Sequence, residues 1–362
     1  MNPLATAGTT KGMKIVRRLP RRIVLLVVAG LLAASVAAVT AVIAFARGTA
    51  SPIGSGVVVI DTDLAYQGNA AAGTGMVLTS SGEVLTNNHV ISGATSVKVI
   101  VPTTNHSYTA RVVGYDRAAD VALLQLQGAS NLKTVGISWA DLPVGAAVTA
   151  LGNAGGDGKI TSAAGTVTGL GKAITASDAG GASEQLTGLI ETNAGVQPGD
   201  SGGPLVNRQG QVVGMDTAAS AHFGFQNVSA TDAYAIPIAK ALTVAHSISS
   251  GKASATVHVG ATAFLGVEVR SVVTPGYGNG GPGASASGAL IASVVSGGPA
   301  ASAGLAAGDV ITAIDGHTVS SPSAIPALLL TKKPGAKISV AYVDQSGTSH
   351  TASLTLGSGP PQ

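Results

Sequence analysis

Short runs of apolar and β-branched residues alternate with small polar turns between Val57 and about Ser250. Runs rich in Val, Ile, Thr and Leu, bounded by Gly, Asn and Asp, are typical of β-strands. Strands that recur about every ten residues predict antiparallel barrels or sandwiches, and the length of this region suits two small barrels in tandem. One stretch near the end of the region has the apolar spacing of a helix. The strand runs lie at 75–90, 95–101, 109–116, 120–126 and 210–218, and the helical stretch at 235–251.

A second folded unit is expected from 254 to 357, and it mixes strands with a short helix. The segment that joins the two units, 249–260, is short and polar. The tail that begins at Gly357 is rich in Gly and Pro, and we expect it to be disordered. The elements of the second unit are expected at 263–270, 290–319, 323–331, 337–344 and 351–356, with the helix at 323–331.

The first part of the chain carries an uncharged apolar run from Ile23 to Ala46. A helix of this length is long enough to cross a bilayer, so we expect a transmembrane anchor at 23–46. The positive-inside rule then places the basic segment 1–22 in the cytoplasm and everything after the anchor outside it. The alternative is a cleaved signal peptide, because "AFA" at 44–46 resembles a processing site. The flanking basic residues are Lys11, Lys14, Arg17, Arg18, Arg21 and Arg22.

Composition and charge exclude several kinds of site. The chain has no cysteine, which excludes disulfides, thiolate metal sites and cysteine nucleophiles but leaves the compartment open. Of its 20 basic residues, seven belong to the anchor and its flanks (the six above and Arg47), which leaves 13 against 17 acidic residues in the remainder. The net charge of +3 therefore reflects a membrane flank, and no nucleic-acid partner is expected.

The stretch "QPGDSGGPLVN", 197–207, surrounds one serine with glycine and proline. These residue types are common in turns, so a simple loop is one interpretation. The other concerns the backbone, because Gly199 lacks a Cβ and can turn its N–H inward beside that of Ser201. Two such donors aimed at one point would stabilise an oxyanion.

A serine nucleophile needs a base and an acid that orients the base. His89 in "TNNHV" sits where an apolar strand breaks into polar residues, and Asp120 directly precedes an apolar strand. Taken alone, His89 is interpreted as an ordinary surface histidine and Asp120 as a turn residue. Together with Ser201 they form an ordered set of histidine, aspartate and serine.

This order, with "TNNHV", "DVALL" and "GDSGGPL", resembles the chymotrypsin-like serine proteases. The chain is also similar to the HtrA/Deg branch of these proteases in the motifs "GYDRAADVALLQL", "GNAGG", "GQVVGMDTA", "YAIP" and "FLGV". The resemblance implies a mainly β protein: a chymotrypsin-like double β-barrel at 57–250, then an α+β PDZ domain at 254–357. It implies that His89 is the base, Asp120 its partner and Ser201 the nucleophile. The N–H groups of Gly199 and Ser201 would form the oxyanion hole. No cofactor or metal is implied.

The residues around the serine also suggest which side chains a substrate pocket would accept. In trypsin-like enzymes an acid six residues before the nucleophile binds basic side chains, whereas this chain has Gly195 there. The pocket should therefore take small or medium aliphatic residues. One departure concerns Asp200, where the HtrA/Deg branch commonly has Asn; its partner is left open. The expected substrate-binding residues are Gly195, Val196, Thr217, Ala218 and Ala219.

In the second unit, "FLGV" resembles the carboxylate-binding loop of a PDZ domain, which binds peptides by strand addition. The helix around 324–330 would form the other wall of the groove. A generic small domain is the alternative. The expected peptide-binding residues are Phe264, Leu265, Gly266 and Val267.

Three functions compete on these features. The favoured one is a single-pass plasma-membrane serine endopeptidase that cuts unfolded or misfolded exported proteins and binds their C-terminal peptides. An α/β-hydrolase esterase is disfavoured, because the residues after Ser201 predict a strand and hairpin rather than a helix. The remaining alternative is a PDZ-based binding or chaperone scaffold with a weak or silent protease domain. The resemblance also implies a homotrimer, for which the sequence gives no independent signal.

Overall fold

The computed structural model describes residues 54–177, 183–219, 232–271 and 288–362. The expected anchor, 23–46, and the basic segment before it lie outside these residues. Within the described ranges, no helix combines the length and the apolar character that a membrane crossing requires.

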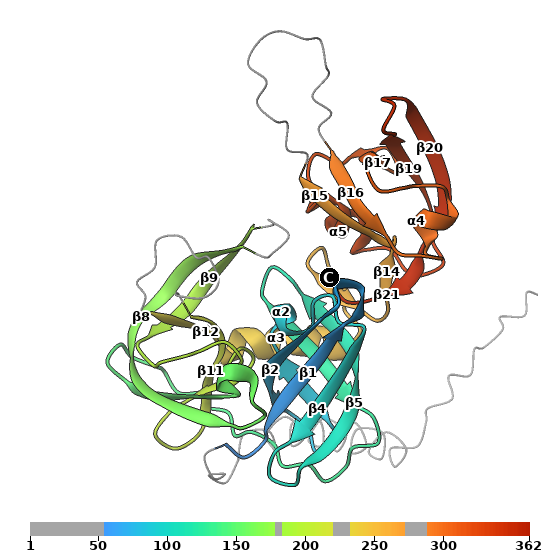
Figure 1. The fold of residues 1–362 in the computed structure, drawn as a ribbon. Coiled ribbons are helices and arrows are strands. Elements are labelled where there is room, and N and C mark those ends of the chain that lie inside the picture. The colour runs from blue at the N-terminus through green and yellow to red at the C-terminus, as the bar shows by residue number, and fades with distance from the viewer. Residues whose placement is uncertain (1–53, 178–182, 220–231, 272–287) are drawn as a thin grey trace, which may run out of the picture. The chain divides into compact units, whose positions relative to one another are not determined.

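The first barrel is an antiparallel sheet in the order β13-β5-β4-β1-β2-β3-β6 (Figure 1). A further pairing of β5 with β6 closes the six strands from β5 to β6 into a ring, and β13 adds to β5 outside that ring. Its interior is filled by Val, Ile, Leu and Ala side chains, as the strand runs predicted. The strands are β1 (Val57–Leu64), β2 (Asn69–Val77), β3 (Glu83–Thr86), β4 (Ser96–Val101), β5 (His106–Asp116), β6 (Val121–Leu126) and β13 (Val257–Val259).

The second barrel is closed, in the order β10-β11-β12-β9-β8-β7. It has its own core of aliphatic side chains, among them Leu205 and Ile190. The strands are β7 (Ala147–Gly152), β8 (Thr161–Ser177), β9 (Ser183–Thr192), β10 (Pro204–Val206), β11 (Val212–Ala219) and β12 (Ala233–Pro237).

A third apolar cluster contains residues of both barrels and of helix α3 (Ile238–Ser249). On β6, Leu123 belongs to this shared cluster, whereas its neighbour Leu124 faces the interior of the first barrel. Side chains on a strand alternate between its two faces, so both faces of β6 are buried. This explains why "VALLQL" is almost continuously apolar instead of alternating.

Two sequence boundaries differ from the structure. The helix expected at 235–251 begins at Ile238, because 233–237 is strand β12, whose Tyr234 and Ala235 pair with β9. The polar joint expected at 249–260 contains strand β13, which adds to the edge of the first barrel against β5. Val257 and His258 are buried there. Both short strands depend on partners distant in sequence, so local patterns do not show them.

The C-terminal unit is built on the strand order β15-β16-β17-β19-β20, with β18 paired to β17. One apolar cluster of aliphatic side chains from these strands and two short helices forms its core. The elements are β14 (Thr262–Phe264), β15 (Val267–Ser271), β16 (Ala289–Val294), α4 (Pro299–Ser302), β17 (Val310–Ile314), β18 (His317–Thr318), α5 (Ala324–Leu329), β19 (Lys337–Val343), β20 (Ser349–Thr355) and β21 (Gly357–Gly359).

The prediction of a disordered tail is wrong. Residues 357–359 form β21, which pairs with β14 in a two-stranded sheet. Beyond this strand, the carbonyl of Pro361 accepts a hydrogen bond from the N–H of Gly93 at 2.8 Å. A tail rich in Gly and Pro is ordered here because its backbone groups have partners elsewhere in the chain.

Candidate active site

His89 lies in α2 (Asn88–Ile91), a single turn of helix that follows β3, and its side chain is 38% exposed. Asp120 ends the turn that leads into β6 and is buried. It has a left-handed backbone conformation, with φ of 53°. Asp and Asn adopt this conformation more readily than other residues that have a side chain. The turn before β6 therefore both bends the chain and directs a carboxylate inward.

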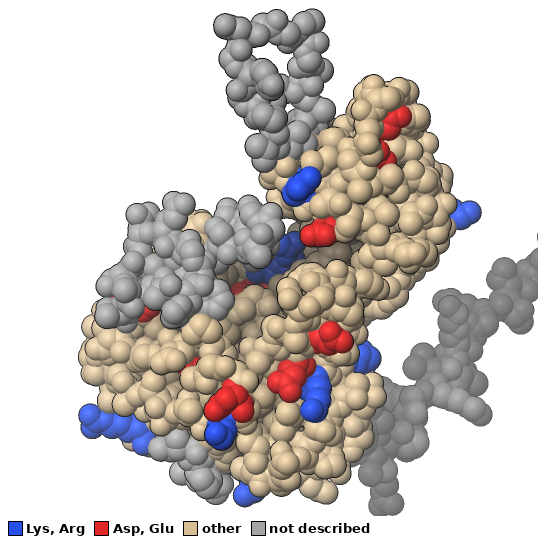
Figure 2. Space-filling model, viewed as in Figure 1, with Lys and Arg blue, Asp and Glu red and all other residues tan. Residues whose placement is uncertain are grey.

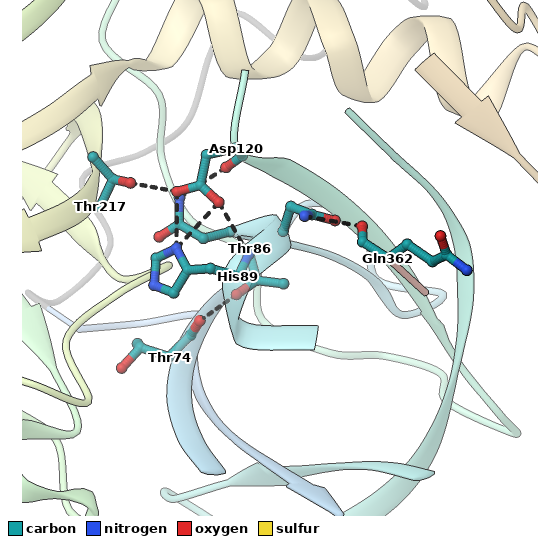
Figure 3. Close-up of polar contacts among 8 residues, drawn as sticks. Thr74, Thr86, His89, Asp120, Thr217 and Gln362 are labelled. Atoms are coloured by element: carbon teal, nitrogen blue, oxygen red, sulfur yellow. Dashed lines mark hydrogen bonds and ion pairs between the residues drawn. The ribbon is translucent and has the colours of Figure 1, made fainter. Parts of the chain in front are cut away.

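The Asp120 carboxylate and the His89 ring face each other (Figure 3). The His89 Nδ1 lies 2.9 Å from Asp120 Oδ2 and 3.1 Å from Oδ1, and the backbone N–H of His89 donates to Oδ1 at 3.0 Å. The hydroxyl of Thr217 also donates to Oδ2. A carboxylate cannot donate, so it is the Nδ1–H of the ring that donates in this contact. These hydrogen bonds offset the cost of burying the carboxylate.

The peptide chain around Ser201 leaves no room for larger residues than glycine. Gly199 has φ of 99°, and a Cβ built on it would lie 2.1 Å from the carbonyl oxygen of Asn153. Gly202 has φ of 84°, and its Cβ would lie 2.2 Å from the carbonyl oxygen of Thr74. Close backbone approach and positive φ together require glycine at both positions. The glycines beside Ser201 are therefore required by the backbone around it.

Two backbone donors are expected to form the oxyanion hole. Within the described ranges, the N–H groups of Gly199 and Ser201 donate no hydrogen bond to a backbone carbonyl. The carbonyl in the peptide unit of each of these N–H groups accepts a hydrogen bond. The Pro198 carbonyl accepts from the Gly155 N–H, and the Asp200 carbonyl accepts from the Gly203 N–H, each at 2.8 Å. Fixing the carbonyl end of a planar peptide fixes the direction of its N–H.

Comparison with known proteins then shows what kinds of domain these are. The family described as Trypsin-like peptidase domain matches residues 73–215, and the PDZ domain family matches residues 263–356. The chain carries a trypsin-like peptidase domain followed by a PDZ domain. The mainly β peptidase fold and the PDZ domain expected from the sequence are thereby confirmed.

Serine protease PepD of Mycobacterium tuberculosis is 33% identical over 317 residues, which are 83% of this chain and 63% of that protein. A probable periplasmic serine endoprotease DegP-like of Pseudomonas fulva is 34% identical over 292 residues, which are 80% of this chain and 56% of that protein. The resemblance to HtrA/Deg proteases is confirmed by these relatives. The chain spans about three fifths of the length of the relatives that it matches.

Among solved structures, the HtrA-type protease AlgW with tripeptide matches with 27% identity and a TM-score of 0.46, covering 85% of this chain and 95% of that chain. The domain identities above depend on the sequence matches alone.

Two of the predicted substrate-binding residues have side chains with partners inside the protein. The Val196 side chain is buried in the core of the second barrel, and the Thr217 hydroxyl is engaged by Asp120. Gly195 is exposed, and a Cβ built on it would lie 4.0 Å from the Cβ of Ala163. Ala218 and Ala219 continue the backbone of β11 beside β12.

Sequence reasoning missed a second buried acid near the serine. Asp216 in β11 is fully buried, and within the described part of the chain neither of its carboxylate oxygens has a hydrogen-bond partner. Burial, and secondarily the charge of Asp200, raise its pKa well above the usual range. The available signal was an acid at the centre of the apolar run "VVGMDTA".

Asp200, whose partner the sequence left open, is also buried. Its Oδ2 accepts the Gln197 N–H at 2.9 Å, as a turn acid would, while within the described residues its buried Oδ1 has no partner. Burial raises the pKa of Asp200, and the Gln197 hydrogen bond only partly opposes this effect. Two acids, Asp200 and Asp216, therefore lie buried close to the nucleophile.

In the PDZ domain, the expected "FLGV" loop connects β14 to β15. The carbonyls of Leu265 and Gly266 accept hydrogen bonds from Ala300 and Val295, whereas within the described ranges their N–H groups donate none. Gly266 has φ of 82°. The loop borders a groove that is also lined by residues of the C-terminal tail, among them Pro361 and Gln362. The groove is lined on the β15 side by Phe264, Leu265, Val267 and Val269 and on the α5 side by Ile325 and Leu329.

Proposed function

We propose that this protein is a serine endopeptidase that uses Ser201 as nucleophile, His89 as general base and Asp120 as the group that orients the base. The observation that carries the proposal is the Asp120 carboxylate, which accepts a hydrogen bond from His89 Nδ1 and so fixes the orientation of the ring. The relatives named as serine proteases support it.

The reaction follows from these roles. His89 Nε2 takes the hydroxyl proton as Ser201 Oγ attacks the carbonyl carbon of the scissile peptide bond. The negative charge that develops on the carbonyl oxygen is stabilised by the N–H groups of Gly199 and Ser201. The resulting imidazolium is stabilised by Asp120 and gives its proton to the leaving amine. Water, activated by the same base, then releases the acyl group from Ser201.

The proposed substrates are unfolded or misfolded exported proteins, cut after small or medium aliphatic residues. Support comes from the absence of a side chain at Gly195 and from relatives that are named periplasmic. On the face in Figure 2, Lys and Arg are interspersed with Asp and Glu, so no single sign of charge would select a substrate there. We further propose that segment 23–46 anchors the protein in the plasma membrane, with both domains outside the cytoplasm.

We propose that the PDZ groove binds the C-terminal peptides of substrates. The unused N–H groups of the "FLGV" loop support recognition of a carboxylate, and the apolar lining supports an aliphatic last residue. Binding there would raise the effective concentration of a substrate near the peptidase domain.

Casein hydrolysis and labelling by a fluorophosphonate test the proposed chemistry. Ser201→Ala and His89→Ala should each lose several powers of ten in turnover, and Ser201→Ala should lose labelling. His246→Ala is the matched control, because His246 lies exposed on α3. Undiminished turnover in Ser201→Ala would show that the assignment is wrong.

A further inference from the structure

Thr74, in β2 of the first barrel, is a fully buried residue whose polar groups all face the second barrel or its own sheet. Its N–H donates to the carbonyl of Ser201 at 2.9 Å, and its carbonyl accepts the Thr86 hydroxyl at 2.7 Å (Figure 3). Its hydroxyl donates to the carbonyl of Gly199 at 2.7 Å and accepts the N–H of Asn153 at 2.9 Å. One threonine thus contacts two loops of the other barrel.

These two loops together determine the direction of one oxyanion donor, the N–H of Gly199. The Gly199 N–H belongs to the peptide unit of Pro198, whose carbonyl is held by Gly155 in the short helix η2 (Ala154–Gly156). The Thr74 hydroxyl ties the start of that segment, at Asn153, to Gly199 itself. A shift of either loop would rotate the peptide unit that carries the Gly199 N–H.

We propose that Thr74 is, through its hydroxyl, a positioning residue for the oxyanion hole, holding the 153–156 and 198–201 loops in register. This inference rests on the proposed serine peptidase function and adds a residue that does not itself touch substrate. Its effect would fall on the transition state, because the oxyanion forms only there.

A buried hydroxyl can also be merely structural, and the chain offers a matched case. Thr62 in β1 is also buried, and its hydroxyl donates to the carbonyl of Ala71 at 3.2 Å, inside the same sheet. Removing either hydroxyl leaves a carbonyl without its donor and should reduce stability. Of the two hydroxyls, only that of Thr74 ties the loop that carries the oxyanion donors to the neighbouring 153–156 loop.

The experiment compares Thr74→Val, Thr74→Ser and Thr62→Val in the full chain, with kcat and KM measured on a peptide substrate and normalised by active-site titration. We expect Thr74→Val to lose about 10- to 100-fold in kcat with little change in KM, because a small misplacement of catalytic groups has effects of this size. Thr74→Ser keeps the hydroxyl and should restore kcat. Thr62→Val should keep wild-type kcat.

Affinity for a peptide boronic acid gives a second readout, because its serine adduct is tetrahedral and places an oxygen in the oxyanion hole. Its affinity for Thr74→Val should fall in parallel with kcat. If Thr74→Val does not fold, Thr74→Cys serves instead, since a thiol is a weaker donor, and kcat should again fall.

A wild-type kcat and boronate affinity in folded Thr74→Val or Thr74→Cys would overturn the inference, as would equal losses in Thr62→Val. Turnover that does not depend on Ser201 would refute the proposed function itself. That outcome is read from the comparison of wild type with Ser201→Ala, so it is separate from any result with the Thr74 and Thr62 variants.

Discussion

Replacing the buried acid Asp216 by an asparagine should stabilise the protein, increasingly so as the pH rises. The Asp216 carboxyl has no hydrogen-bond partner within the described chain, and burial raises its pKa well above the usual range. An unfolded chain exposes the same carboxyl to water, where it ionises near about pH 4. Above that pH the unfolded state has released a proton that the folded state still holds.

The contribution of Asp216 to the stability of the wild type therefore falls as the pH rises through this window. The slope is at most about 1.4 kcal/mol per pH unit for one proton, and it ends where Asp216 ionises in the folded state. The amide of the Asp216→Asn variant has no proton to release, so this contribution is absent from the variant. The difference in stability between Asp216→Asn and wild type should be smallest near about pH 4, grow with pH and then level off.

Urea denaturation followed by circular dichroism at a series of pH values measures this difference directly. Asp141→Asn is the matched control, because Asp141 is exposed and the substitution removes a carboxyl group that folding does not bury. Equal or lower stability of Asp216→Asn at neutral pH, or a difference that does not grow with pH, would refute the reasoning.

Two further predictions concern the site and the groove. Thr217→Val removes one of the donors to the buried Asp120 carboxylate, so kcat should fall about tenfold or more, consistent with the free energy of a hydrogen bond to a charged group. Thr243→Val on α3 is the control, because the Thr243 hydroxyl bonds within its own helix. An unchanged kcat in Thr217→Val would contradict the role of Thr217. A peptide with a free aliphatic C-terminus should bind the PDZ groove more tightly than its amidated form in a fluorescence anisotropy titration; equal affinities would exclude carboxylate recognition by the "FLGV" loop.

The sequence by itself determined the features that local chemistry specifies. Strand runs, their turns and the glycines around Ser201 follow from backbone preferences within a few residues. His89, Asp120 and Ser201 could be picked out because each sits at a strand end or turn and carries a reactive group. The structure places the first two within hydrogen-bonding distance. Their roles as catalytic residues stay a prediction.

Only the tertiary structure decided which groups meet across the chain. Thr74 and Gly199 are 125 positions apart, and Thr217 and Asp120 are 97 apart, so no local pattern marks the hydroxyls that hold the site. Strands β13 and β21 form because distant edges offer backbone partners, although their own sequences look like a joint and a tail. The burial of Asp216 and its nearness to Asp200 are likewise properties of the folded chain. Hydrophobic pattern is a property of the strand, whereas hydrogen-bond partners and desolvation are properties of the whole fold.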